Sequence, residues 1–299
     1  MSNNWEEKYW ELMLKENFDE AIPLKLDNFP KSFFKYRTLS NRTIENLNES
    51  YVWLAEISSL NDPFECSIQF DNDECLRLFY GSNKFRENFK IVSGETLSQK
   101  EIFRLTESQK PYEEYLTLFK EKGFEIKVTP EEQLKKVQSR WDEIVKERNQ
   151  NLKICSFSLV KHSLLLWSHY SQDHKGIAIE YDFINSESIR AFIQPIIYRN
   201  RIHKIGLFEE YNTINMIVSG LIKSEEWSYE KEWRITSFKQ FDEFPNIMKV
   251  PKPVAIYLGT RFSENDEKLK SELYAYAKKN KVPLNEMVKH PNKFELIAK

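Results

Sequence analysis

Residues 227–234 read WSYEKEWR and lead into a predicted strand. On a strand, Glu230 and Glu232 would project to the same face, because alternate side chains point the same way. Two carboxylates so close together favour partial protonation of one and a hydrogen-bonding role for the other. Such a pair suits a site that stabilises a cationic transition state or binds a ribose hydroxyl. The alternative is a solvated strand face on which Lys231 and Arg234 form local ion pairs.

Alternating and aromatic patterns predict further strands on both sides of this stretch. The predicted strands span residues 32–38, 51–55, 153–159, 176–182, 232–238 and 254–258, with two more near 282–288 and 294–297, and residues 195–198 are expected to pair with 176–182. Helical periodicity predicts helices at residues 5–17, 40–47, 163–171, 208–226 and 266–279.

Residues 71–149 differ in character, because they are highly charged and have helical periodicity. We interpret them as an insertion of roughly four helices. The order of elements predicts an α+β fold in a single domain spanning residues 1–299. In this fold, residues 1–70 and 150–299 form a split, mixed and mostly antiparallel sheet, and residues 71–149 form the helical insertion.

Glycine is scarce, and its scarcity excludes several nucleotide-binding loops. Seven of the 299 residues are glycine, or about 2%, against about 7% in average proteins. Loops that cradle phosphates need clustered glycines, since these let the backbone approach the ligand closely. The sequence contains neither GxGxxG nor GxxxxGK[ST]. A Rossmann fingerprint and a P-loop are therefore absent.

Charge and cysteine content narrow the setting. The formal net charge of −2 gives no global attraction to nucleic acid or to an anionic membrane. The three cysteines share no metal-ligand spacing, which argues against a zinc site and favours a reducing compartment. We expect no metal. The N-terminus lacks a signal pattern and no apolar run is long enough to span a bilayer, so we expect a cytoplasmic protein without membrane contact.

Two further segments offer polar groups for ligand binding. Arg37 follows Tyr36 on a predicted strand, where its guanidinium is suited to a phosphate or carboxylate. The alternative for Arg37 is a structural salt bridge. Asn61 and Asp62 precede Pro63 in a loop that is able to offer oxygens to a ligand. Local turn hydrogen bonds explain these two residues equally well.

A third segment is aromatic. On a helix, Trp167 lies beside Tyr170, because residues three apart are neighbours. His174 follows that helix and precedes the predicted strand that holds Tyr181, so it is a candidate acid, base or hydrogen-bond donor. The ordinary alternative is a loop histidine without a role.

Four motifs together resemble the bacterial domain of unknown function 2971 family. They are FKYR at residues 34–37, LNDPFE at 60–65, LWSHY at 166–170 with HKGIAIEY at 174–181, and WSYEKEWRI at 227–235. The motifs cover about residues 33–260, and the family name implies no activity.

The order of these motifs also resembles the ADP-ribosyltransferase superfamily. That fold splits a mixed sheet around a helical segment, with a basic residue on an early strand, aromatic residues in the middle and Glu-x-Glu on a late strand. The resemblance implies that Arg37 holds the NAD pyrophosphate or ribose and that Glu232 stabilises the oxocarbenium ion while Glu230 orients the acceptor. It further implies cofactor contacts from Tyr36, Asn61, Asp62, Trp167, Tyr170, His174 and Tyr181. The Ser-Thr-Ser strand motif and an early-strand histidine are missing.

From this resemblance we expect an NAD-dependent ADP-ribosyltransferase or an NAD-cleaving effector, of the kind found among bacterial toxins and phage-defence proteins. NAD would be the substrate, the acceptor a protein or a nucleic acid, and a defence-system protein a partner. One alternative is a metal-dependent nuclease or hydrolase that uses Asp62, Glu65, His174 and Glu232. Another is a non-catalytic module that senses a ligand or a partner with the same groups.

Overall fold

The computed structural model describes residues 5–124, 132, 139, 142–143, 145–146, 148–205, 217–238 and 246–299. The chain divides into two compact units. The first consists of Met1–Cys66, Gln150–Arg201 and Gly220–Lys299, and the second of Ser67–Asn149 and Ile202–Ser219. The fold is α+β. Within the described ranges, no helix is long and apolar enough to cross a bilayer.

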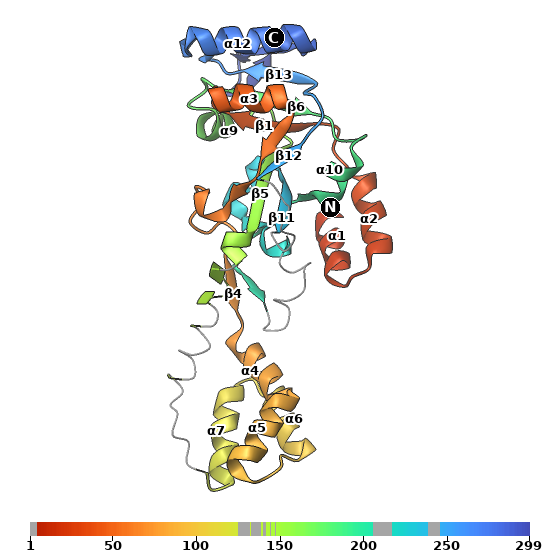
Figure 1. Ribbon diagram of the computed structural model, residues 1–299, viewed down its shortest axis with the longest axis vertical. Coiled ribbons are helices and arrows are strands. Elements are labelled where there is room, and N and C mark those ends of the chain that lie inside the picture. Colours follow the sequence, from red (N-terminus) through yellow and green to blue (C-terminus); the bar gives the residue numbers. More distant parts are fainter. Residues whose placement is uncertain are drawn as a thin grey trace. The chain divides into compact units, whose positions relative to one another are not determined.

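A mixed sheet forms the centre of the first unit (Figure 1). Its strands lie in the order β15 (Leu296–Ala298), β14 (Leu284–Lys289), β13 (Ala255–Leu258), β6 (Ile177–Tyr181), β1 (Phe33–Arg37), β5 (Leu152–Ser158), β11 (Glu232–Phe238) and β7 (Ile193–Pro195), and β3 (Ala55–Glu56) also pairs with β5. Strands β13 and β14 are parallel, and the other pairs are antiparallel. Strand β1, which contains Arg37, and strand β11, which contains Glu232, therefore lie on either side of β5.

Short two-stranded sheets complete this unit. β2 (Tyr51–Trp53) pairs with β12 (Ile247–Lys249), and β8 (Ile197–Arg199) pairs in parallel with β10 (Ile222–Ser224). The α-helices of the unit are α1 (Trp5–Leu14), α2 (Phe18–Asp27), α3 (Asn41–Glu49), α9 (Leu164–Tyr170), α10 (Glu187–Phe192) and α12 (Glu267–Asn280), and the 3-10 helices are η1 (Ile57–Ser59), η3 (Glu225–Glu230) and η4 (Phe262–Glu264).

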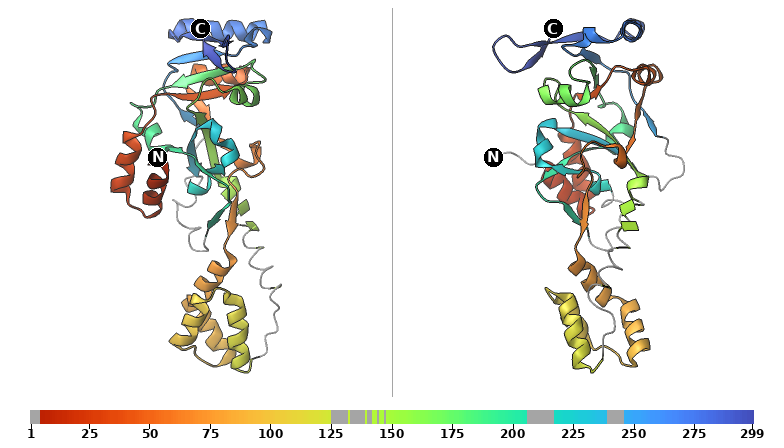
Figure 2. Two further views of the ribbon diagram at one scale, coloured as in Figure 1. Left: turned by 180° about the vertical axis from the view of Figure 1, so that it is seen from behind. Right: turned by 90° about the vertical axis from the view of Figure 1, so that its left-hand side faces the viewer.

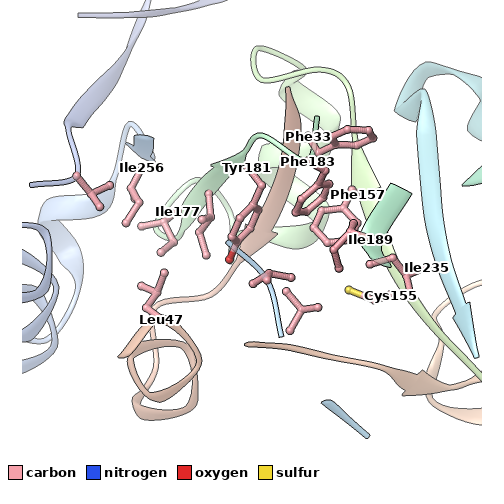
Figure 3. Close-up of a cluster of buried hydrophobic side chains, with 14 of the residues drawn as sticks. Phe33, Leu47, Cys155, Phe157, Ile177, Tyr181, Phe183, Ile189, Ile235 and Ile256 are labelled. Carbon is pink, nitrogen blue, oxygen red and sulfur yellow. The ribbon is translucent and has the colours of Figure 1, made fainter. Parts of the chain in front are cut away.

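Alternation along the strands separates two buried clusters. Phe33 belongs to the larger cluster, whereas Phe34 and Tyr36 belong to a second one with Trp167. Figure 3 shows the larger cluster, in which rings from different strands point toward one another. Its Phe183 stacks on Tyr181 at 5.6 Å and meets Phe157 edge-on at 5.3 Å. These aromatic contacts hold the strands that frame the site.

The N-terminal helices are fixed to the sheet by buried polar contacts. Figure 2 shows α1 and α2 side by side. The Tyr9 hydroxyl donates to Gln194 Oε1 at 2.5 Å, next to edge strand β7. Lys25 Nζ donates to the carbonyl oxygens of Arg190 at 2.7 Å and Ile193 at 3.3 Å, at the end of α10. A buried lysine thus satisfies carbonyls that the short helix leaves without a partner.

The second unit contains α4 (Asn72–Gly81), α5 (Asn83–Ser93), α6 (Gln99–Glu107) and α7 (Pro111–Glu121), and β4 (Ile68–Phe70) pairs in parallel with β9 (His203–Ile205). Caps explain where several of these helices begin. Ser98 and Glu101 form a capping box at α6, and Ser82 caps α5. The interior is aromatic, with Tyr80 stacked on Tyr115 at 5.1 Å.

Several sequence predictions of elements are confirmed, among them the strands at 32–38, 176–182, 232–238 and 254–258 and the helix at 266–279. The helix predicted at 208–226 is wrong from residue 222 onward, where β10 and η3 lie, and residues 208–216 lie outside the described ranges. The predicted partner of residues 195–198 is also wrong, because β7 pairs with β11 and β8 with β10. Within the predicted helical insertion, residues 125–131 lie outside the described ranges.

Candidate functional site

A cavity of about 640 Å³ lies in the first unit. Its walls come from segments spread along the sequence: β1, α3, β2, β3, the loop after η1, β5, α9, β10, η3 and β11. All four segments singled out in the sequence contribute to it. Their lining residues are Phe34, Lys35, Tyr36, Arg37, Leu60, Asn61, Glu65, Leu166, His169, Tyr170, Glu230, Glu232 and Arg234.

One end of the cavity is built from five buried charged residues, Glu65, Lys223, Glu230, Glu232 and Arg234, which we call the ionic cluster. Lys223 Nζ lies 2.7 Å from Glu230 Oε2 and 2.9 Å from Glu232 Oε2. Arg234 contacts Glu232 through Nε at 2.7 Å and Glu65 through a terminal nitrogen at 2.9 Å. Each of the five side chains is 4% exposed or less. Such charges are stable in the interior because they neutralise one another.

The two carboxylates of Glu230 and Glu232 meet by a route other than the one predicted. Glu230 ends the 3-10 helix η3, Lys231 takes a left-handed conformation with φ 43°, and Glu232 begins β11. The prediction that both glutamates share one strand is therefore wrong. They converge because the chain turns sharply between them and Lys223 bridges both. On β11 itself, Glu232 and Arg234 share the face opposite Trp233.

The electrostatics distinguish the two carboxylates. Burial opposes ionisation of Glu232, but the charges of Arg234 and Lys223 outweigh it and hold the pKa of that carboxyl well below its ordinary value of 4.5. Burial raises the pKa of Glu230, Lys223 opposes that rise, and Glu232 adds to it. The Tyr170 hydroxyl donates to Glu230 Oε1 at 2.8 Å. The pair thus combines a carboxylate held ionised with one that has a higher affinity for a proton.

Three further lining residues, Lys35, Arg37 and Arg42, carry positive charge and form no ion pair within the described ranges. Arg37 ends β1 and lines the cavity, and within the described ranges its guanidinium forms no ion pair. Arg42 lies over the Trp53 ring, with Cζ 4.1 Å from the centroid. Lys35 Nζ donates to the Ser156 carbonyl at 2.6 Å. We call Lys35, Arg37, Arg42 and Trp53 the basic end.

Some predicted ligand-binding residues line the cavity and others do not. Tyr36, Arg37, Asn61 and Tyr170 line it. Tyr181 lies in the hydrophobic core, apart from the cavity lining. Trp167 is fully buried, and its Nε1 donates to the Lys161 carbonyl at 2.7 Å. Its ring meets Tyr36 edge-on at 5.2 Å, so Trp167 supports the wall from behind.

Asp62 and His174 are held by turn geometry rather than facing the cavity. Asp62 Oδ1 accepts from the Phe64 amide at 2.8 Å, which is the Asx-turn alternative. His174 is the last of three consecutive left-handed residues, with φ 67°. This turn packs against Gly259, where a Cβ atom would lie 2.0 Å from the His174 carbonyl oxygen. Neither residue lines the cavity.

Comparison with known families locates one match. Residues 166–235 match the family model described as Protein of unknown function (DUF2971). The matched region runs from α9 into β11, so it contains Tyr170 and all of the ionic cluster except Glu65, and it leaves Arg37 outside. No curated protein matches the chain significantly, and no solved structure does so either.

Sequence reasoning missed several residues of the cavity, above all Lys223, Arg42 and Trp53. Lys223 fell within a predicted helix. Nothing in the sequence therefore indicated that it lies on a strand close to two glutamates. For Arg42 the available signal was its position one helical turn before Asn46. Across the described ranges, no group of three or more His, Cys, Asp or Glu side chains is arranged to hold a metal ion.

Proposed function

We propose that the cavity binds NAD and that the protein is an NAD-dependent ADP-ribosyltransferase or NAD-cleaving enzyme. One observation carries the proposal: a single cavity is lined both by Arg37, whose guanidinium forms no ion pair within the described ranges, and by a buried glutamate pair whose members differ in proton affinity. An arginine suits a diphosphate, because its planar donors bind phosphate oxygens in pairs. An ionised carboxylate suits a reaction that develops positive charge.

The proposed reaction breaks the bond between the ribose and nicotinamide. Nicotinamide leaves with the bonding electrons, and the ribose becomes an oxocarbenium ion. Glu232, kept ionised by Arg234 and Lys223, stabilises this cation. The oxygen or nitrogen of an acceptor, or of water, then bonds to the ribose carbon, and its proton passes to Glu230, because burial raises the pKa of that carboxyl and makes it the stronger base of the pair.

The sheet order supports the resemblance to ADP-ribosyltransferases. The early strand β1 ends at the basic residue and the late strand β11 begins at the glutamate, and both pair with β5. The two groups belong to one sheet and line one cavity. A split sheet of the ADP-ribosyltransferase kind, a protein or nucleic-acid acceptor and a role in bacterial conflict or phage defence with a partner protein are parts of the proposal that rest on resemblance.

The metal-dependent hydrolase alternative has less support. Glu65 and Glu232 are near each other, but both are ion-paired with Arg234. Asp62 and His174 do not line the cavity with them. Two of the four residues that this activity needs are therefore absent from the cavity lining, so we do not propose it.

Nicotinamide release from NAD tests the proposal. We expect the wild-type protein to release nicotinamide, and Glu232→Gln to lower the rate on the order of 100-fold or more, because an amide does not supply the negative charge. Glu180→Gln is the matched control: Glu180 lies on β6 of the same sheet and accepts from Tyr257 at 2.7 Å, outside the cavity lining. Thermal melts verify that both variants are folded. An unchanged rate in Glu232→Gln, or no release by the wild type with any acceptor extract, contradicts the proposal.

A further inference from the structure

Helix α3 and strand β2, which follow β1 in the sequence, contribute three residues to the cavity lining. Arg42 and Asn46 are four residues apart on α3, so they lie on one face of the helix. Trp53 ends β2, and the Arg42 guanidinium lies over its ring. All three residues line the cavity.

Two of these side chains have unused binding capacity. Asn46 Oδ1 is buried and accepts no hydrogen bond from the described part of the chain. A buried acceptor without a donor is unfavourable, so a ligand N–H that reaches it gains more than an ordinary surface hydrogen bond. Arg42 is exposed and has no carboxylate partner within the described ranges, so the outer face of its planar guanidinium is open. A flat cationic surface beside a free acceptor fits an aromatic ring that bears an amino group.

We infer that Arg42, Asn46 and Trp53 form a subsite for the adenine base of a nucleotide. The base stacks on the outer face of the Arg42 guanidinium, whose inner face lies on the Trp53 ring, and its exocyclic amino group donates to Asn46 Oδ1. Arg37 lies between Lys35 and α3 along the chain, and it binds the diphosphate. The inference deepens the proposed function, and it rests on that function in taking a dinucleotide as the natural ligand.

Binding of ADP and of inorganic pyrophosphate, measured by calorimetry, tests the subsite separately from catalysis. Pyrophosphate has the charge of the diphosphate but no base. Trp53→Ala removes the ring that holds the Arg42 guanidinium in place for stacking. We expect it to weaken ADP binding about 10-fold, within the range for one lost stacking contact, and to change pyrophosphate affinity less than about twofold. Trp53→Phe keeps an aromatic ring and should restore most of the ADP affinity.

A second pair of variants tests the hydrogen bond. Asn46→Ala should weaken ADP binding roughly three- to tenfold, the usual range for a lost hydrogen bond, with pyrophosphate binding unaffected. Asn48→Ala is the matched control, because Asn48 is on the same helix, is exposed and does not line the cavity. Arg37→Gln should weaken both probes.

The outcomes separate this inference from the proposed function. ADP contains no nicotinamide, so its binding does not depend on bond cleavage. If ADP binds as expected but NAD releases no nicotinamide, the enzyme assignment fails and the subsite remains. If Trp53→Ala leaves ADP affinity unchanged, or weakens both probes equally, the subsite is wrong even when nicotinamide is released. The same holds if wild-type protein binds ADP no more tightly than pyrophosphate.

Discussion

The ionic cluster and the basic end are two parts of one cavity, and they differ in how far their charges are paired within the protein. In the ionic cluster, Lys223 and Arg234 contact three carboxylates within a few ångströms, and almost no side-chain surface is exposed. At the basic end, neither Arg37 nor Arg42 forms an ion pair within the described ranges. The Arg42 guanidinium lies over the Trp53 ring instead. The protein neutralises its charges at one end and leaves them available at the other.

This difference indicates a division of roles. Charges fixed by protein partners do not reorganise when a ligand binds, which is the condition for stabilising a charged transition state. Charges without protein partners instead gain their partners from a ligand, which gives affinity for an anion. The ionic cluster is therefore suited to chemistry and the basic end to binding, and variants at each end should fail in different ways.

The largest effect is expected at the ionic cluster. Arg234→Met leaves Glu65 and Glu232 buried without their guanidinium partner. Breaking a buried ion pair from one side lowers the free energy of unfolding by about 3–5 kcal/mol. Urea unfolding followed by fluorescence measures this change as a lower midpoint at an unchanged slope.

Arg261→Met is the matched control for that experiment. Arg261 contacts Glu264 at 2.8 Å, but both side chains are more than 40% exposed. An exposed pair contributes little, since water solvates both charges well. We expect its midpoint to match the wild type. Equal losses in the two variants would mean that burial adds nothing to the ionic cluster.

The sequence predicted the parts of this site that depend on local pattern. Polar and aromatic residues were dense in four segments, and all four line one cavity. Arg37 was placed on a strand by its aromatic neighbours, and that strand is β1. Glu232 was placed on a strand that the structure begins at the same residue. Short-range alternation is enough for such assignments, because it reflects which side chains a sheet buries.

The rest depends on contacts that no local pattern encodes. The left-handed turn at Lys231 brings Glu230 back toward Glu232, and a β pattern assumes that the chain stays extended there. Lys223 meets its glutamates only because β10 pairs with β8 in the folded chain. The contact of Arg42 with Trp53 likewise requires α3 to pack near β2. Tertiary packing decides all three.

A smaller effect is expected where the backbone positions Arg37. A Cβ atom on Gly176 would lie 2.2 Å from the Arg37 carbonyl oxygen and 2.9 Å from that of Ser171. Gly176→Ala must therefore move the end of β1, and overpacking of this kind costs about 1–3 kcal/mol. ADP affinity should fall as well, because the guanidinium moves with its backbone.

Gly81→Ala is the control, since its nearest neighbour, Thr106 Cγ2, is at 3.4 Å. Similar stability and ADP affinity in the two variants would show that Gly176 does not set the position of Arg37.

The smallest effect is a pH dependence of binding at the basic end. Burial lowers the pKa of Lys35 to about 8, Arg37 adds to this shift, and Cys155 and Glu232 oppose it. Lys35 is positive below this pKa and neutral above it, so an anionic ligand should bind a few-fold more weakly at about pH 9 than at about pH 7. ADP-ribose is the probe, because its diphosphate keeps one charge state over that range. Lys35→Met should bind more weakly at the lower pH and lose the pH dependence.

Burial also lowers the pKa of Lys25 to about 8, but Lys25 does not line the cavity, so Lys25→Met should keep the pH dependence of the wild type. If the pH dependence of ADP-ribose affinity persisted in Lys35→Met and disappeared in Lys25→Met, the titrating group would be Lys25. Lys35 would then not belong to the basic end.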